Sequence, residues 1–168
     1  MRSVSKRVSS VVDDCNIDVV LRTMDSYKTS TGKGFVGGAF MGNKVEIGPK
    51  GEVAKVIANQ EINTEALFKA DTYEHKGTSI MHELTEAYEG AKIAWKKGKS
   101  VPSPDVKYRF YNRAHRKATP QISKTLFGVT YYDLNGNTVT DGKQAVRADF
   151  YIKPSINSND KTLFLTIP

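Results

Sequence analysis

The segment TSIMHELTEAYEGAKIAWKKG, residues 78 to 98, carries the clearest helical pattern in the chain. Thr78 or Ser79 can cap its first turn, and Gly98 can end it behind a basic last turn. We therefore predict an amphipathic helix between these residues. Its buried stripe would comprise Ile80, Leu84, Ala87, Tyr88, Ala91 and Trp95.

A second helix is indicated by KSVPSPDVKYRFYNRAHRKATP, residues 99 to 120. Ser103 stands at the cap position, Pro104 and Asp105 suit the first turn, and Pro120 lies just past the end. Because the connection between the two helices is short, we expect them to form an antiparallel pair. The inner face of the second helix would hold Tyr111, Ala114, His115 and Ala118.

The segments before the first helix favour a small antiparallel sheet. Residues 1 to 31 show no clear pattern, although their Val-rich part could be a short helix or strand. Residues 32 to 43, GKGFVGGAFMGN, contain five glycines and indicate a mobile loop or an irregular strand whose backbone approaches another segment closely. Short strands at 45–47 and 53–57, joined by the turn GPKG, predict a hairpin, and a short helix follows.

The last part of the chain, residues 121 to 168, has the alternating pattern of β-strands. Asn-Gly at 135–136 marks a hairpin turn, and we prefer this interpretation of DLNGNTVTD to a calcium loop because the terminal glutamate is missing. The sequence therefore predicts one α+β domain over residues 1–168: a small antiparallel sheet, two packed helices and a β-rich C-terminal part.

Composition supports a folded domain. The chain has 168 residues, of which 39% are hydrophobic and 26% charged, as in globular proteins. Cys15 is the only cysteine, so an intramolecular disulfide is excluded. No apolar run is long enough for a signal peptide or a membrane span. We expect a soluble protein in the cytoplasm or in a virion, without contact to a membrane.

The net charge of +7 is concentrated in one segment. Between Lys92 and Lys124 there are ten basic residues and one acid, Asp105. Such a segment could bind nucleic acid, an acidic protein or an acidic substrate, or could be an ordinary solvated helix face.

The first helix also carries residues that suit a metal site. His82 and Glu86 are four residues apart, so their side chains project from one helix face and can reach the same ion. A catalytic zinc needs a third protein ligand and an open position for water. His115, on the inner face of the second helix, could supply that ligand, and His75 is its rival. Glu83 would then be the general base.

The run HELTEAY, residues 82 to 88, resembles the active helix of zincin metallopeptidases, especially gluzincins and small zincin-like domains that read His-Glu-Leu-x-His-Ala-Tyr. The resemblance covers residues 79–118 and implies that His82 is a zinc ligand and Glu83 the base. The chain departs from the family at Glu86, where a histidine is expected. If His115 replaces the downstream glutamate of the gluzincins, two histidines and one carboxylate are still present.

On this reading the protein is a zinc-dependent metallopeptidase acting on a peptide or protein substrate. Zinc would be held by His82, Glu86 and His115, and Glu83 would take a proton from the metal-bound water. An additional carboxylate makes the metal a weaker Lewis acid. Slow catalysis, or a purely structural metal, is therefore also compatible with the sequence.

Three alternatives stay open. Residues 82–89 could be the acidic surface of an ordinary helix. The protein could be a non-catalytic subunit of a larger assembly, such as a bacteriophage virion or tail, since chains with such modified helices are similar to small proteins of Bacteroidetes bacteria and their phages. Nucleic acid could bind the basic segment, with support only from the interleaved Tyr108, Phe110 and Tyr111.

Overall fold

The computed structural model describes residues 2–73, 77–101, 109–119, 126–140, 145–153 and 162–167. They belong to two compact units, Met1–Gln121 and Ile122–Pro168. The first unit combines helices with a three-stranded sheet, and the second contains a four-stranded sheet. The predicted α+β class is confirmed. No helix in the described part of the chain is long and apolar enough to cross a membrane.

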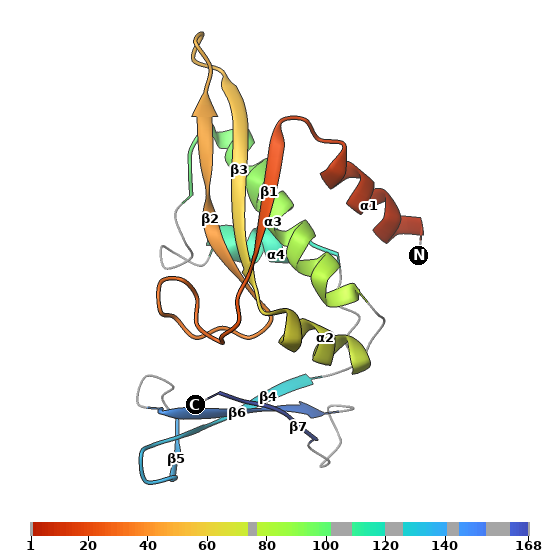
Figure 1. The fold of residues 1–168 in the computed structure, drawn as a ribbon. Helices are drawn as coiled ribbons and strands as arrows, with labels where there is room; N and C mark the ends of the chain where they lie inside the picture. Colours follow the sequence, from red (N-terminus) through yellow and green to blue (C-terminus); the bar gives the residue numbers. More distant parts are fainter. Residues whose placement is uncertain are drawn as a thin grey trace. The chain divides into compact units, whose positions relative to one another are not determined.

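The sheet of the first unit is built around its central strand (Figure 1). Its strands β1 (Ile17–Thr23), β2 (Gly38–Ile47) and β3 (Val53–Ile62) lie in the order β1-β3-β2. The predicted hairpin is confirmed, because β2 and β3 pair antiparallel, and both strands are longer than expected. The N-terminal segment supplies β1, which pairs parallel with β3. The sheet is therefore mixed, whereas the sequence predicted an antiparallel one.

The glycine-rich segment proves to be partly strand. β2 begins at Gly38, and its register against β3 shifts between Phe40 and Asn43. Gly42, inside this irregularity, has a φ of 92°, which an L side chain rarely adopts. Residues 38–43 thus form an irregular strand, which was one of the two interpretations of the glycine pattern.

One long helix covers a face of this sheet. α3 (Thr78–Lys97) packs on β3, and α1 (Arg2–Val12) and α2 (Thr64–Tyr73) pack on α3 (Figure 1). Ala87 and Ala91 on the helix and Val56 and Ala58 on β3 have no exposed surface. Small side chains on both sides allow the helix and the strand to approach closely, and they form the centre of the core.

The two ends of α3 are formed differently. Gly98 ends the helix in a left-handed conformation, as predicted, with a φ of 61°. At the other end the predicted cap is wrong, because Gly77 precedes the helix and no side chain of Thr78 or Ser79 caps it. Instead, the Asp71 carboxylate accepts hydrogen bonds from the backbone N–H of Gly77 and of Ser79, at 2.5 and 2.9 Å. A neighbouring helix thus supplies the capping oxygen.

The second predicted helix is α4 (Arg109–His115), which packs against α3. The expected cap and first turn, Ser103 to Asp105, lie outside the described residues, as does the side chain of Tyr111. The helix ends before Pro120, and residues 116–118 continue it as turns and a bend. The Arg7 guanidinium donates to the carbonyl oxygens of Lys117 and Ala118, which ties this segment to α1.

The second unit is an antiparallel sheet. Its strands β4 (Leu126–Tyr132), β5 (Thr138–Val139), β6 (Arg147–Lys153) and β7 (Thr162–Ile167) lie in the order β5-β4-β6-β7. β4 and β5 form the hairpin predicted from Asn-Gly. The Asp133 carboxylate accepts hydrogen bonds from the N–H groups of Asn135 and Asn137 and holds the turn.

A buried carboxylate organises one face of this sheet. Asp149 on β6 is 3% exposed. It accepts hydrogen bonds from Nε and Nη2 of Arg147, at 3.1 and 2.6 Å, and from the Thr166 hydroxyl on β7, at 2.8 Å. Chiefly because of the bond to Arg147, the pKa of Asp149 is lowered from 3.8 to about 2.

Asp149→Asn should therefore lower the free energy of unfolding by about 1 kcal/mol at neutral pH, after screening of the half-exposed Arg147. Because the folded state holds the pKa below its ordinary value, the stabilisation is complete above about pH 4 and is lost as the pH falls through about 2. Urea unfolding of both proteins, followed by circular dichroism from pH 2 to 7, measures this. A difference that stays constant between pH 4 and 2 would contradict it.

Candidate metal centre

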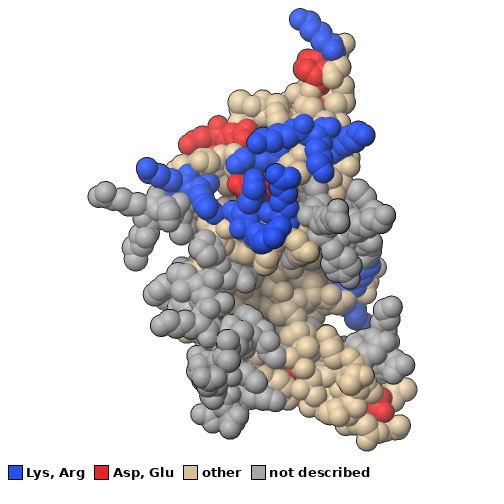
Figure 2. Space-filling view, turned by 180° about the vertical axis from the view of Figure 1, so that it is seen from behind, with Lys and Arg blue, Asp and Glu red and all other residues tan. Residues whose placement is uncertain are grey.

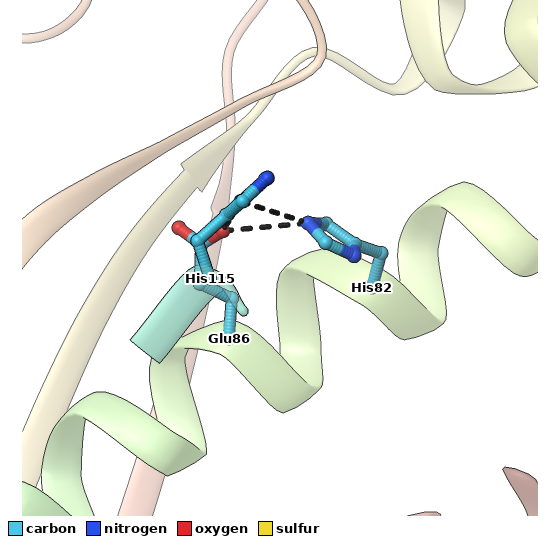
Figure 3. Close-up of side chains that lie close together, drawn as sticks. All are labelled: His82, Glu86 and His115. Carbon is cyan, nitrogen blue, oxygen red and sulfur yellow. Dashed lines mark hydrogen bonds and ion pairs between the residues drawn. The ribbon is translucent and has the colours of Figure 1, made fainter. Parts of the chain in front are cut away.

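α3 and α4 bring together the three residues predicted as metal ligands (Figure 3). His115 Nδ1 lies 2.5 Å from Glu86 Oε2, and His82 Nε2 lies 3.4 Å from the same oxygen. The two histidine nitrogens are 3.1 Å apart. These distances place two nitrogen atoms and one oxygen atom around one point, so His82, Glu86 and His115 could hold a metal ion.

The orientation of the His82 ring is determined by a backbone carbonyl. Its Nδ1 lies 2.7 Å from the carbonyl oxygen of Thr119. Since a carbonyl only accepts hydrogen bonds, Nδ1 carries the hydrogen, and in the neutral ring Nε2 keeps its lone pair toward Glu86 and His115. A ligating histidine usually donates its second ring nitrogen to a carboxylate or carbonyl in this way.

Two threonines hold that carbonyl in place. The Thr85 hydroxyl lies 3.0 Å from the Thr119 hydroxyl and accepts a hydrogen bond from the Thr119 N–H at 2.8 Å. Thr85 and Thr119 are 2% and 1% exposed. They fasten the segment after α4 to the turn of α3 between His82 and Glu86. The pair therefore helps to set the distance between the two helices at the site.

Burial and charge at the site suit a cation. Glu86 is 1% exposed and His82 3% exposed, whereas the His115 side chain is 44% exposed and marks the side that faces solvent. Glu86 Oε1 is buried and makes no hydrogen bond within the described part of the chain. A buried carboxylate requires a proton or a cation, and a metal ion would satisfy its second oxygen.

The spacing of the ligand atoms fits a small ion in part. In a tetrahedral zinc site, ligand atoms about 2.0–2.1 Å from the metal are about 3.3 Å apart. The distances of 3.4 and 3.1 Å from His82 Nε2 agree with this. The third distance, 2.5 Å between His115 Nδ1 and Glu86 Oε2, is shorter than the separation of two ligand atoms on one zinc ion. Metal binding would require the half-exposed His115 ring to move outward slightly.

The Glu83 carboxylate lies on the sheet side of α3. Gln60 on β3 donates from Nε2 to Glu83 Oε2 at 2.5 Å, and a Cβ at Gly38 would collide with the Glu83 carboxylate. Burial raises the pKa of Glu83 to about 7, with a further contribution from the charge of Glu86. The close approach expected somewhere in the glycine-rich segment thus occurs at Gly38.

His82 responds to the same carboxylates. Burial alone would lower its pKa, but the contacts with Glu86 and the Thr119 carbonyl, together with the charges of Glu83 and Glu86, raise it above the ordinary value. The site therefore favours positive charge next to Glu86, whether carried by a proton or by a metal ion.

The sequence predicted the three residues that the structure brings together, but it did not predict the residues that hold them in place. His75, the rival ligand, lies outside the described residues. Thr119, Thr85 and Gln60 were not predicted, because a lone threonine or glutamine carries no pattern that would single it out. For Gly38 there was a signal, the run of glycines before β2.

Comparisons with known proteins add no relative. No family model matches the chain, and no curated protein or solved structure is significantly similar to it. The likeness of HELTEAY to the zincin helix stays a prediction from the sequence. The case for a metal centre therefore depends on the geometry of His82, Glu86 and His115.

The contact between Gly38 and Glu83 can be tested by a double-mutant cycle. Gly38→Ala should lower the free energy of unfolding by about 1–3 kcal/mol, because the added methyl displaces the Glu83 carboxylate from Gln60. In a Glu83→Ala background the same change should cost much less. Gly34→Ala is the control, since its Cβ would meet nothing closer than 4.0 Å. Equal costs in both backgrounds would refute the contact.

Proposed function

We propose that the protein is a zinc-dependent hydrolase of the zincin type that cleaves peptide bonds. The observation that carries the proposal is the convergence of His82 Nε2, Glu86 Oε2 and His115 Nδ1, with the His82 ring oriented by the Thr119 carbonyl. Ordinary helix-surface residues would be exposed, whereas Glu86 and His82 are almost completely buried.

The donor set favours zinc. Imidazole nitrogen suits zinc, copper, iron and nickel, whereas magnesium and calcium prefer oxygen ligands alone. Two histidines and one carboxylate are a common ligand set for catalytic zinc, with the fourth position open to water. The His115 side chain is partly exposed, so a fourth position on that side of the ion would be accessible to solvent. A bound zinc ion would lower the pKa of its water and polarise the substrate carbonyl.

Glu83 is the residue of this chain that would move the proton. It follows His82 directly in the sequence, and the charges of Glu86 and His82 both contribute to the pKa of its carboxyl group. The Gln60 amide engages Oε2, so Oε1 is the oxygen that would accept a proton. In this arrangement Gln60 and Gly38 would position Glu83, and Glu83 would act as the general base.

The contacts that join α3 to the segment after α4 favour a second possible role, in which the metal is structural. The ligands come from α3 and from a segment 29 residues further along the chain, and the Thr85–Thr119 contact already joins these segments. A metal ion there would act as a cross-link between them. A structural metal of this kind is compatible with the alternative expected from the sequence, a non-catalytic subunit of a larger assembly such as a virion or tail.

The metal site itself is tested by elemental analysis and zinc titration. Purified protein should contain about one zinc per chain. His115→Ala and Glu86→Gln each remove a ligand and should weaken zinc binding by more than the 10- to 100-fold expected for loss of a supporting residue. The matched control is Glu89→Gln, one turn further along α3, which should bind zinc as the wild type does.

Circular dichroism of each variant separates metal loss from unfolding. A wild-type protein that takes up no zinc after reconstitution would refute the metal site. Equal zinc affinity of His115→Ala and the wild type would exclude His115 as a ligand.

Hydrolysis is tested separately with a variant of Glu83, the proposed general base. Glu83→Gln keeps the shape of the side chain and should leave zinc content unchanged, while lowering the rate of cleavage of an unstructured peptide substrate by about 100-fold or more. Cleavage is measured by appearance of new amino termini. Full zinc occupancy without measurable cleavage by the wild type would refute the peptidase and favour the structural subunit.

A further inference from the structure

A second surface of the first unit concentrates positive charge in a hollow. This hollow has a volume of about 180 Å³ and lies between α3 and α4. Five of its lining side chains are basic and one is apolar: Lys92, Lys96, Lys97, Arg113, Lys117 and Ile93. Ile93 is 6% exposed, whereas Lys96, Lys97, Arg113 and Lys117 are exposed. Most of the cations that line the depression therefore belong to residues that are exposed to solvent.

An adjoining hollow extends this surface toward α1. Its volume is about 230 Å³, and it shares Lys92 and Lys117 with the first hollow. Arg7 adds a sixth cation, and among the residues that the structure describes Glu89 is the only acid lining either hollow. We call the two hollows together the basic channel. Figure 2 shows the lysine and arginine side chains gathered on one face of this unit.

The channel arises from helical spacing on two elements. Lys92 and Lys96 are four residues apart on α3, and Arg113 and Lys117 are four apart on α4 and the turn that follows it. Like charges at this spacing repel each other. Glu89 offsets part of the repulsion, because its carboxylate lies 3.0 Å from the Lys92 ammonium and 3.8 Å from that of Lys117. The remaining positive charge attracts an anionic partner.

The shape of the channel indicates which kind of anion fits. The two hollows share Lys92 and Lys117, so their cations are spread over an extended surface. Such a surface suits an extended chain of charges better than a single phosphate ion, and a recess between helices suits a chain better than a flat bilayer. The Tyr88 ring in the channel is 8% exposed and lies under the Lys92 ammonium, at 5.2 Å. It offers little surface for base stacking, so contacts would go to the phosphates.

We propose that the basic channel binds the phosphate backbone of a nucleic acid without sequence preference. Lysine acts as a point-charge partner for phosphate, and Arg113 can donate to two phosphate oxygens at once. The cations of the channel are not residues of the metal centre, although Thr85, which contacts Thr119 beside that centre, also lines the second hollow. The His115 ring contacts His82 and Glu86 on α3, whereas its neighbours Arg113 and Lys117 line the channel.

The test is fluorescence anisotropy of labelled oligonucleotides, of mixed sequence and about 20 nucleotides long, titrated with the full chain at several NaCl concentrations. The variant Lys96→Gln/Lys97→Gln/Arg113→Gln removes three exposed channel cations. It should raise the dissociation constant at low salt by about 10-fold or more and reduce the slope of log affinity against log salt by about 2. Changing the base sequence should have little effect.

The matched control removes the same charge elsewhere on the unit. Lys44, Lys50 and Lys69 lie outside the channel, and their triple glutamine variant should change the affinity by less than about threefold. Unchanged zinc content and circular dichroism in both variants would show that the first unit is intact.

Three outcomes would overturn the proposal. The first is absence of binding by the wild type even at low salt, and the second is equal weakening in the channel variant and its control, which would reflect net charge alone. The third is tighter, channel-dependent binding to polyglutamate or to phosphatidylserine vesicles than to the oligonucleotide. That result would assign the channel to an acidic protein or to a membrane surface.

Discussion

The close packing of α3 on β3 is the contact on which the first unit depends. Ala87 and Ala91 pack on Val56 and Ala58 without exposed surface, so the helix lies close to the strand. A larger side chain at any of these positions would force the two elements apart. The other sides of the helix contact α1, α2 and α4. Because successive residues of a helix turn by about 100°, His82 and Glu86 then face α4, while Glu83 between them faces Gln60 and Gly38.

This arrangement places buried carboxylates and exposed lysines on one helix, α3. The buried part of α3 carries two carboxylates, Glu83 and Glu86, in an environment that disfavours negative charge. Its last two turns carry the lysines of the basic channel, exposed to solvent. A buried acidic cluster and an exposed basic surface therefore lie on the same element, about two turns apart.

Contacts with residues outside α3 hold His82 and Glu86 in position next to His115. The Thr119 carbonyl selects the tautomer of His82, Thr85 and Thr119 join α3 to the segment after α4, and Arg7 fastens that segment to α1. None of these groups would be a metal ligand. They join α3 to the segment that follows His115, and in this way they help to hold His82, Glu86 and His115 close together.

The sequence alone determined features that depend on local periodicity: the extent of α3 and its end at Gly98, the β2–β3 hairpin, the Asn-Gly turn and the shared helix face of His82 and Glu86. The position of His115 on the inner face of a second helix could also be predicted from the sequence, because the apolar residues Ala114 and Ala118, which are buried, indicate that face. Only the tertiary structure decided that Asp71 caps α3, that β1 pairs parallel with β3, and that Thr119 and Gln60 hold the site residues. These contacts join residues far apart in the chain, and such pairings depend on how whole elements pack, which no spacing within a segment encodes.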